Sequence, residues 1–150
     1  MFPEEAKAYM DAYLENYSGV RAYMKDIVEQ ARDMGYVTTL YGRRRYLPEL
    51  KSSNFNLRSF GERVALNTPI QGTAADIIKL AMIRVDRALK QEKLKARLIL
   101  QVHDELIVEC PSEEADRVRA ILEREMQQVA DLTVPLLVEA KHGVSWYEAK

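Results

Sequence analysis

Two adjacent carboxylates, Asp104 and Glu105, are the residues of this 150-residue chain whose types and placement best suit chemistry. Alternating apolar residues over 97–102 and 106–110 flank them and predict two strands joined by a tight turn. Because successive strand residues point to opposite faces, one carboxylate can stand alone at the rim of a sheet. An isolated carboxylate suits Mg²⁺, which binds one or two carboxylates together with substrate phosphates. A polar turn without chemistry is the alternative, because Asp is common in turns.

The net charge of −1 conceals a strong segregation of charge along the chain. Residues 36–103 contain 13 Lys and Arg against 5 Asp and Glu, whereas residues 104–131 contain 3 against 9. A basic middle section favours contact with a nucleic-acid backbone, because neutralised phosphates release their counterions. Solvated helix faces are the alternative, and we favour that interpretation for the lysines within residues 90–95. We favour phosphate contact for three consecutive arginines: Arg43, Arg44 and Arg45.

Much of the chain before the carboxylates is predicted to be helical. Apolar residues at helical spacing indicate helices over residues 3–17, 18–34, 55–66 and 69–92. Gly35 is suited to end the second of these helices. Pro69 is predicted to separate the third from the fourth, because proline removes a backbone donor and disfavours helix in the preceding residue.

The remaining elements complete an α+β pattern. A helix is predicted to begin at Ser112, and residues 134–140 are predicted to form a returning C-terminal strand. Helices, an antiparallel β-hairpin, long helices and a final strand together indicate the α+β class. The single Cys110 excludes an internal disulfide and fits a reducing compartment. No apolar stretch approaches the ~20 residues that a membrane span requires, so we expect a cytoplasmic protein without a membrane partner.

Four segments together resemble the family A DNA polymerases of the DNA polymerase I type, in their bacterial form. Residues 101–109, QVHDELIVE, are similar to the family's motif C. Residues 35–50 (GYVTTLYGRRRYLPEL) and 62–82 (ERVALNTPIQGTAADIIKLAM) resemble family segments in the same order and at similar spacing, and the ending VPLLVEAKHGVSWYEAK resembles the usual C-terminus. The resemblance covers essentially the whole chain. It implies the end of a fingers subdomain over residues 1–60 and a palm portion over residues 61–150.

The resemblance implies a DNA-directed DNA polymerase that transfers nucleotides to a primer 3′ end by a two-metal mechanism. Asp104 would be one of the two aspartates that hold a pair of Mg²⁺ ions. Glu105 would tune the charge of the site, because strand geometry points it away from Asp104. His103 and Gln101 lie two residues apart and so share a strand face, and in the family such residues approach the primer terminus.

A second group of residues would contact the DNA duplex. Arg63 and Asn67 are four residues apart and share a helix face, and Gln71 continues the line beyond Pro69. The resemblance places them at the minor groove, where every Watson–Crick pair presents acceptors largely regardless of sequence. Arg43, Arg44 and Arg45 resemble a basic loop near primer and template phosphates, although one of them could belong to an ion pair instead. Small residues at the start of the predicted helix permit close approach either of DNA or of the sheet on which the helix packs: Gly72, Thr73, Ala74 and Ala75.

The resemblance also indicates what is absent. The segment with the first catalytic aspartate and the helix that grips the incoming nucleotide are not found, and Met1 falls just after that helix would end. The expected partners are therefore primer–template DNA, deoxynucleoside triphosphates and the missing N-terminal polymerase segment. One alternative is a catalytically silent fragment or subunit that binds primer–template DNA and needs a complementing chain. A remote alternative is a metal-dependent phosphohydrolase that uses His103, Asp104 and Glu105.

Overall fold

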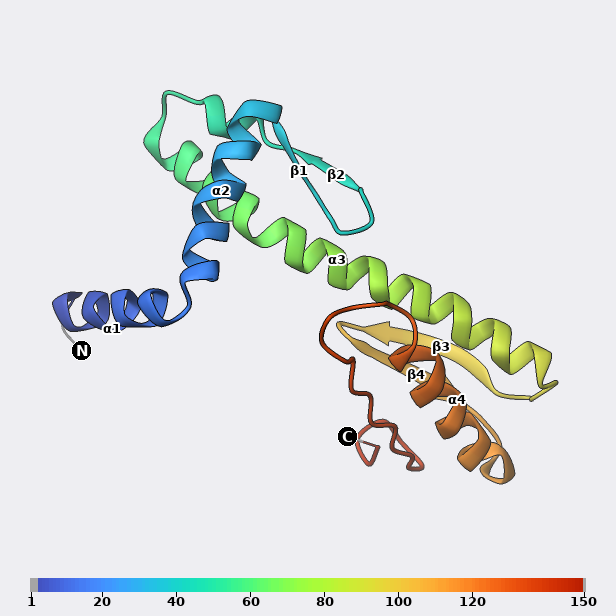
Figure 1. The fold of residues 1–150 in the computed structure, drawn as a ribbon. Coiled ribbons are helices and arrows are strands. Elements are labelled where there is room, and N and C mark those ends of the chain that lie inside the picture. The colour runs from blue at the N-terminus through green and yellow to red at the C-terminus, as the bar shows by residue number, and fades with distance from the viewer. Residues whose placement is uncertain (1–2, 150) are drawn as a thin grey trace. The chain divides into compact units, whose positions relative to one another are not determined.

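The computed structural model describes residues 3–149 and contains two compact units, which are best understood separately (Figure 1). The first unit ends at Thr73 and the second begins at Ala74. Both combine helices with one antiparallel hairpin, so the predicted α+β class is confirmed. The division into fingers and palm between residues 60 and 61 is a functional assignment and stays a prediction.

The first unit is mainly helical. Its elements are α1 (Pro3–Asn16), α2 (Ser18–Met34), β1 (Tyr36–Thr38), β2 (Arg44–Tyr46), the 3₁₀ turn η1 (Pro48–Lys51) and the first part of α3 (Phe55–Gln91). Gly35 ends α2 as predicted: it adopts the left-handed conformation with φ +79°, and its N–H donates to the carbonyl of Ala31 over 2.9 Å. A residue with a side chain would be strained there, which is why glycine is common after helices.

The core of this unit joins α2, β1, η1 and α3. Its buried members are Ala31, Val37, Leu47, Leu50 and Ala65. Around this core the hydroxyl of Tyr23 donates to the carbonyl of Leu66 over 3.3 Å, and its partial burial raises the pKa of that hydroxyl. An ion pair between Arg32 and Glu62 also connects α2 with α3.

The predicted break at Pro69 is wrong, because α3 is one continuous helix from Phe55 to Gln91 with Pro69 inside it. Proline has no N–H, so the helical hydrogen bond from position 69 to the carbonyl of Ala65 cannot form. Ala65 before the proline and Ala81 after it are both buried. The helix is therefore packed in the first unit at Ala65 and in the second unit at Ala81. Tertiary packing therefore outweighs the local cost of the proline, as it commonly outweighs intrinsic propensity.

The tip of the β1–β2 hairpin packs on α3 at Gly72. Thr39 is buried, and a Cβ added at Gly72 would lie 2.6 Å from its Cγ2. The backbone N–H of Leu40 also donates to Oγ1 of Thr73 over 2.9 Å, and Arg43 donates to the carbonyl of Gly72 over 3.1 Å. Of the two interpretations open for Gly72, the structure therefore supports close packing within the protein.

The second unit is built around the predicted hairpin. Its elements after α3 are β3 (Arg97–Val102), β4 (Glu105–Glu109), the 3₁₀ turn η2 (Ser112–Glu114) and α4 (Ala115–Gln127). The buried core residues come from α3, α4 and the loop just before β3: Val85, Ala88, Leu89, Ala96, Val118 and Ile121. Leu106, Val108 and Cys110 pack against this core. Glu114 receives the backbone N–H groups of Lys95 and Ala96 over 3.0–3.1 Å, and so holds the loop that leads into β3.

The predicted C-terminal strand is wrong, because residues 134–140 are irregular. A strand needs a neighbouring strand for its backbone groups, and each sheet within residues 3–149 contains only two strands. Side chains of α4 bind this segment instead. Nε2 of Gln127 donates to the carbonyl of Val138 over 3.1 Å, and the N–H of Ala140 donates to Oε1 of Glu123 over 3.3 Å.

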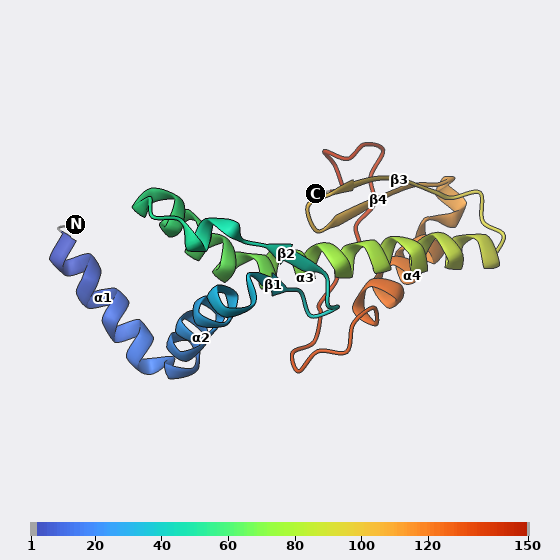
Figure 2. The ribbon, with the colours of Figure 1, turned by 90° about the horizontal axis from the view of Figure 1, so that it is seen from above.

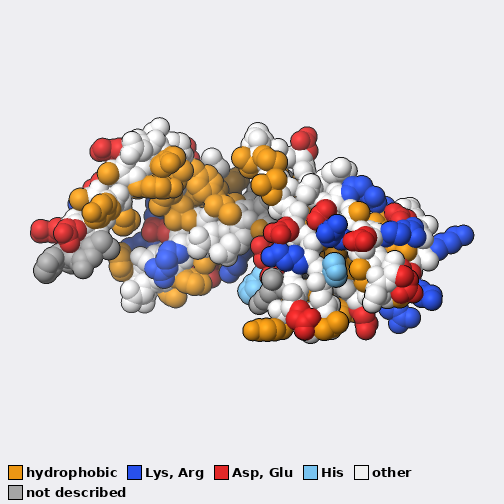
Figure 3. Space-filling model, turned by 90° about the horizontal axis from the view of Figure 1, so that it is seen from below, with side chains coloured by type: hydrophobic (Ala, Val, Ile, Leu, Met, Phe, Trp, Pro, Cys, Tyr) orange, Lys and Arg blue, Asp and Glu red, His pale blue; other side chains and the backbone are white. Residues whose placement is uncertain are grey.

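The two units differ in their surfaces (Figure 3). On the face drawn there, hydrophobic side chains gather over the first unit, whereas charged side chains of both signs cover much of the second. Exposed apolar residues of the first unit include Tyr9, Met10 and Phe55. None of the helices described in residues 3–149 combines the length and the apolar character that a membrane crossing requires.

Substituting Gly72 by Ala should destabilise the first unit by about 1–3 kcal/mol, the usual cost of overpacking. Thr39 cannot readily move aside, because it is buried and its Oγ1 receives the N–H of Arg43. Urea unfolding followed by circular dichroism measures the effect. Thr39→Ser, which removes the clashing methyl and keeps the hydroxyl, should restore much of the lost stability in the double variant.

Gly19→Ala is the matched control, because a Cβ at that helical position meets nothing within 4 Å. It should stabilise the chain by about 0.5–1 kcal/mol, through helix propensity alone. Equal effects of the two glycine substitutions would contradict the packing role of Gly72.

Candidate active-site turn and nucleic-acid face

The turn between β3 and β4 is only two residues long. Val102 pairs with Glu105 in the antiparallel ladder, which leaves His103 and Asp104 to reverse the chain. His103 adopts a left-handed backbone conformation with φ +51°. Such a conformation is uncommon for residues other than glycine, although His tolerates it better than most. The predicted hairpin is confirmed, with strand ends within one residue of those expected.

Gln101 braces this turn from one side. Its Nε2 donates to the backbone carbonyl of His103 over 2.6 Å. Gln101 lies opposite Leu106 in the ladder, and Leu106 packs on the core formed with α3 and α4. Gln101 is accordingly half-buried, whereas the His103 side chain is exposed. The two residues predicted to share a face are therefore joined through a side-chain to backbone hydrogen bond.

The two carboxylates have different surroundings. Oε2 of Glu105 receives a hydrogen bond from Nε1 of Trp146 over 3.3 Å. Asp104 is exposed, and no hydrogen bond or ion pair to another residue of 3–149 engages its carboxylate. The C-terminal segment returns to this end of the hairpin, as two views show (Figures 1 and 2). Asp104 is thus the carboxylate that is available to a ligand.

Two other arrangements of reactive residues are weaker candidates. No group of three or more His, Cys, Asp or Glu side chains within the described residues is placed to hold a metal ion. His103, Asp104 and Glu105 therefore do not converge, and the phosphohydrolase interpretation lacks the cluster that it requires. Partial burial and the nearby carboxylates of Glu114 and Glu113 raise the pKa of the Cys110 thiol. A raised pKa disfavours the nucleophilic thiolate, so Cys110 is unsuited to catalysis.

A row of polar side chains lies on α3 in the first unit. Arg63, Asn67 and Gln71 are spaced four residues apart, and all three are exposed. Because α3 is continuous through Pro69, the row follows one face of a single helix. Ala65, which is fully buried, lies on the side of the helix away from Arg63 and Asn67. The continuous helix therefore keeps the three donors on one face, whereas the predicted break would have interrupted their alignment.

The three consecutive arginines have different surroundings within the first unit. The guanidinium of Arg43 donates to the carbonyl of Gly72, as described above. The guanidinium of Arg44 lies 4.7 Å from the centre of the Tyr36 ring, within the range of a cation–π contact. All three side chains remain exposed, including that of Arg45. Arg43 therefore has a structural contact, and Arg44 and Arg45 present most of the available positive charge.

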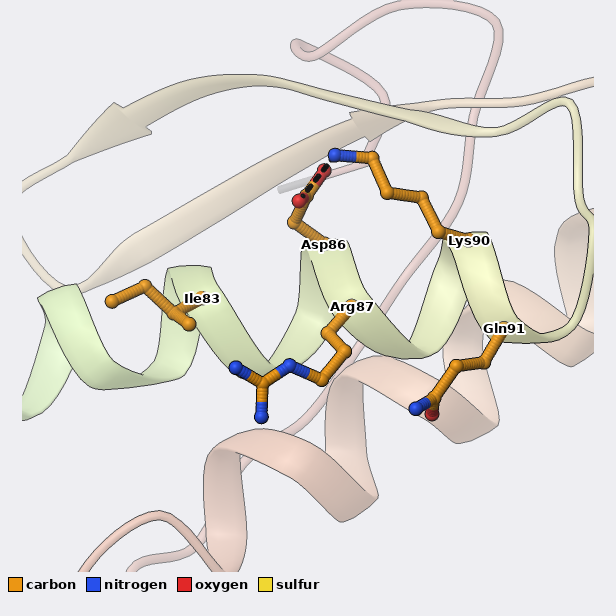
Figure 4. A pocket seen from close by; sticks show the side chains of 5 residues that line it. All are labelled: Ile83, Asp86, Arg87, Lys90 and Gln91. Carbon is orange, nitrogen blue, oxygen red and sulfur yellow. Dashed lines mark hydrogen bonds and ion pairs between the residues drawn. The ribbon is translucent and has the colours of Figure 1, made fainter.

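A shallow hollow lies on α3 in the second unit (Figure 4). Asp86 and Lys90 extend on one side of the helix and form an ion pair of 2.7 Å, while Arg87 and Gln91 extend on the other. Exposed ion pairs of this kind contribute little stability. The hollow is open and holds no convergent set of polar groups, so we assign it no function.

Comparison with known proteins identifies the family. The sequence profile described as DNA polymerase family A matches residues 1–148. The chain belongs to DNA polymerase family A. It is 57% identical over 147 residues to DNA polymerase I of Bacillus subtilis (strain 168) and 54% identical to that of Bacillus caldotenax. Each match covers 98% of this chain and 17% of the relative, so the chain spans about a sixth of the length of these polymerases.

Part of a solved structure has the same fold as this chain. It is the POL domain of Pol1 from M. smegmatis, studied in complex with DNA primer-template and dNTP. The TM-score is 0.95 at 50% sequence identity, and the match covers 99% of this chain and 26% of that one. This identity is high enough that the two chains share a family as well as a fold.

One residue at the candidate site was missed by sequence reasoning. Trp146 contacts Glu105 although the two are far apart in sequence, and no spacing rule connects them. The only available signal was that Trp146 is the single Trp of the chain, within a segment that resembles the family C-terminus. The contact depends on the path of residues 134–149, which local patterns mispredicted.

The strained turn generates a prediction about stability. The free energy of unfolding of His103→Gly should be about 1 kcal/mol higher than that of His103→Ala, because glycine accepts φ +51° without strain. Urea unfolding of both variants measures the difference. At Asp104, whose φ is not positive, Gly should show no such advantage over Ala. An equal free energy for the two His103 variants would mean that the turn is not strained.

Proposed function

We propose that this chain is the C-terminal part of the catalytic domain of a DNA-directed DNA polymerase. The reaction is the transfer of a nucleotide from a deoxynucleoside triphosphate to the 3′ end of a primer on a DNA template. Membership of family A supports the proposal, as does the solved relative studied with primer-template and dNTP. The observation that assigns the reaction to particular residues is the exposed Asp104 carboxylate on a two-residue turn that Gln101 braces.

Asp104 is assigned to hold Mg²⁺. Its carboxylate fits that metal, because it is exposed, has no partner within residues 3–149, and can share the ion with substrate phosphates. When bound, a pair of such ions stabilises charge on the attacking and leaving oxygens. This chain spans 17% of its relatives' length, and we assign the second aspartate to polymerase sequence outside it.

The neighbours of Asp104 have supporting roles in this proposal. Glu105 sets the negative charge beside the metal ligand while its own carboxylate is engaged by Trp146. His103 projects from the tip of the turn and approaches the primer terminus. Gln101 holds the backbone of His103 in place through its hydrogen bond to the carbonyl.

The exposed row on α3 is assigned to the DNA duplex. Arg63, Asn67 and Gln71 all carry N–H donors, and acceptors on every base pair line the minor groove. Donors along one helix face can therefore test the geometry of a pair without identifying its bases. Arg44 and Arg45 are assigned to backbone phosphates, since their positively charged side chains are exposed.

A catalytically silent fragment that binds primer–template DNA is the second candidate. This candidate rests on the exposed row of donors on α3 and does not require Asp104 to bind a metal. In that case a complementing polymerase segment would supply all of the catalysis and the chain would contribute DNA binding alone, so Asp104→Ala would leave the complemented activity unchanged.

Primer extension separates these candidates. We expect no extension by the chain alone with Mg²⁺ and the four deoxynucleotides, and extension when the preceding polymerase segment is added in trans. Asp104→Ala should abolish the complemented activity, because it removes a metal ligand. Asp131→Ala, which removes an exposed carboxylate elsewhere, should leave it unchanged. Extension by the chain alone would contradict the assignment of the second aspartate to an outside segment.

Duplex binding tests the row on α3. Arg63→Ala and Gln71→Ala should each weaken binding to primer–template DNA by about 3–10-fold, as expected for the loss of one hydrogen bond. Arg87→Ala is the matched control, because Arg87 is exposed further along the same helix and carries no assigned contact. Arg44→Ala should instead reduce the salt dependence of binding, since it removes a phosphate contact. Fluorescence anisotropy across a salt series measures both effects. If Arg63→Ala and Gln71→Ala weaken binding no more than Arg87→Ala does, the assignment of the row to the DNA duplex is wrong.

A further inference from the structure

One side chain without an assigned role reaches the catalytic turn from a distant part of the chain. The indole Nε1 of Trp146 donates to Oε2 of Glu105 over 3.3 Å. Glu105 directly follows Asp104 and is the first residue of β4. The contact therefore acts on the residue next to the proposed metal ligand.

Trp146 is presented by a compact turn. The N–H groups of Glu148 and Ala149 both donate to the carbonyl of Ser145 over 3.1 Å, and the Glu148 carboxylate receives the N–H of Val144 over 3.2 Å. Gly143 is required for this packing, because a Cβ there would lie 2.7 Å from Cβ of Glu148 and 3.0 Å from its carbonyl carbon. The turn thus closes on itself around Trp146.

The segment before this turn is attached to α4. Gln127 and Glu123 bind the backbone at Val138 and Ala140, as described above. The opposite side of α4 packs in the core that also supports β4, through Val118 and Ile121. One helix therefore supports both partners of the contact, the β4 strand that begins with Glu105 and the segment that carries Trp146.

The contact separates the roles of two adjacent carboxylates. The indole N–H can only donate, so its hydrogen bond orients Oε2 of Glu105 toward Trp146. With one oxygen of Glu105 held by the indole, the Asp104 carboxylate remains the one without a protein partner in residues 3–149. The turn is then braced twice, by Gln101 at the His103 carbonyl and by Trp146 at Glu105.

We propose that Trp146 is a positioning residue for nucleotidyl transfer. Its indole N–H holds Glu105 at the start of β4, so that Asp104 alone faces the metal and the reacting groups. This inference rests on the proposed polymerase function, and it adds to that function a residue from outside the motif C hairpin.

Tryptophan fluorescence tests the contact without requiring activity. Trp146 is the only Trp in the chain, so the emission spectrum reports on this side chain alone. Glu105→Ala should change the emission maximum and intensity, and Glu105→Gln, which keeps an acceptor oxygen, should change them less. Glu109→Ala, an exposed acid at the far end of β4, is the matched control and should leave the spectrum unchanged. A spectrum that is unaltered by Glu105→Ala, with the circular dichroism preserved, would overturn the proposal.

Kinetics of the complemented polymerase test the positioning role. Trp146→Phe keeps an aromatic ring and removes the N–H, and it should lower kcat for primer extension by about 3–10-fold, the effect of one lost hydrogen bond. KM for the deoxynucleotide should be unchanged, because the helix that grips the nucleotide is expected in the polymerase segment outside this chain. Tyr147→Phe removes a polar group from a neighbouring, 90% exposed aromatic and should have no effect.

A double-variant comparison shows whether Trp146 acts through Glu105. Once Glu105→Ala has removed the acceptor, Trp146→Phe should cause no further loss, whereas independent effects would multiply. Independent effects, or a fully active Trp146→Phe, would overturn the positioning role and leave the proposed function standing. A parent chain that supports no extension on complementation would overturn the proposed function itself, and the catalytic part of this inference with it.

Discussion

The two-residue turn between β3 and β4 is the constraint on which the candidate active site depends. Pairing of Val102 with Glu105 leaves two residues to reverse the chain, and this brings His103 into a left-handed conformation. For residues with a side chain that conformation costs about 1–2 kcal/mol. Packing of the hairpin on the core of α3 and α4 offsets this cost and holds the strands in register. The same turn leaves Asp104 at the exposed tip, where a metal ligand is useful.

Side-chain to backbone hydrogen bonds hold the irregular parts of the second unit. Glu114 binds the loop before β3, Gln101 binds the turn, and Gln127 and Glu123 bind the C-terminal segment. A sheet of only two strands offers few backbone partners to neighbouring segments. Buried and half-buried backbone groups still require partners. Polar side chains of the helix and hairpin supply them, and in doing so they set the path that brings Trp146 to Glu105.

The first unit serves the proposed duplex face in a similar way. The β1–β2 hairpin packs so closely on α3 at Gly72 that a methyl group would not fit without movement. This packing lies next to Pro69, where the helix lacks one of its own hydrogen bonds. The helix continues through that point, and Arg63, Asn67 and Gln71 consequently follow one exposed face. A rigid helix face is a suitable support for donors that must meet a regular groove.

The sequence by itself determined the α+β class, the hairpin with Asp104 at its turn, and the end of α2 at Gly35. These features depend on alternation, helical spacing and turn-forming residues, which act over a few neighbouring positions. Its resemblance to family A also indicated the family, because several motifs recur in order. Only the tertiary structure decided that α3 passes through Pro69, that residues 134–140 are not a strand, and that Trp146 meets Glu105. Each of these depends on partners far apart in the chain, and local patterns carry no information about such partners.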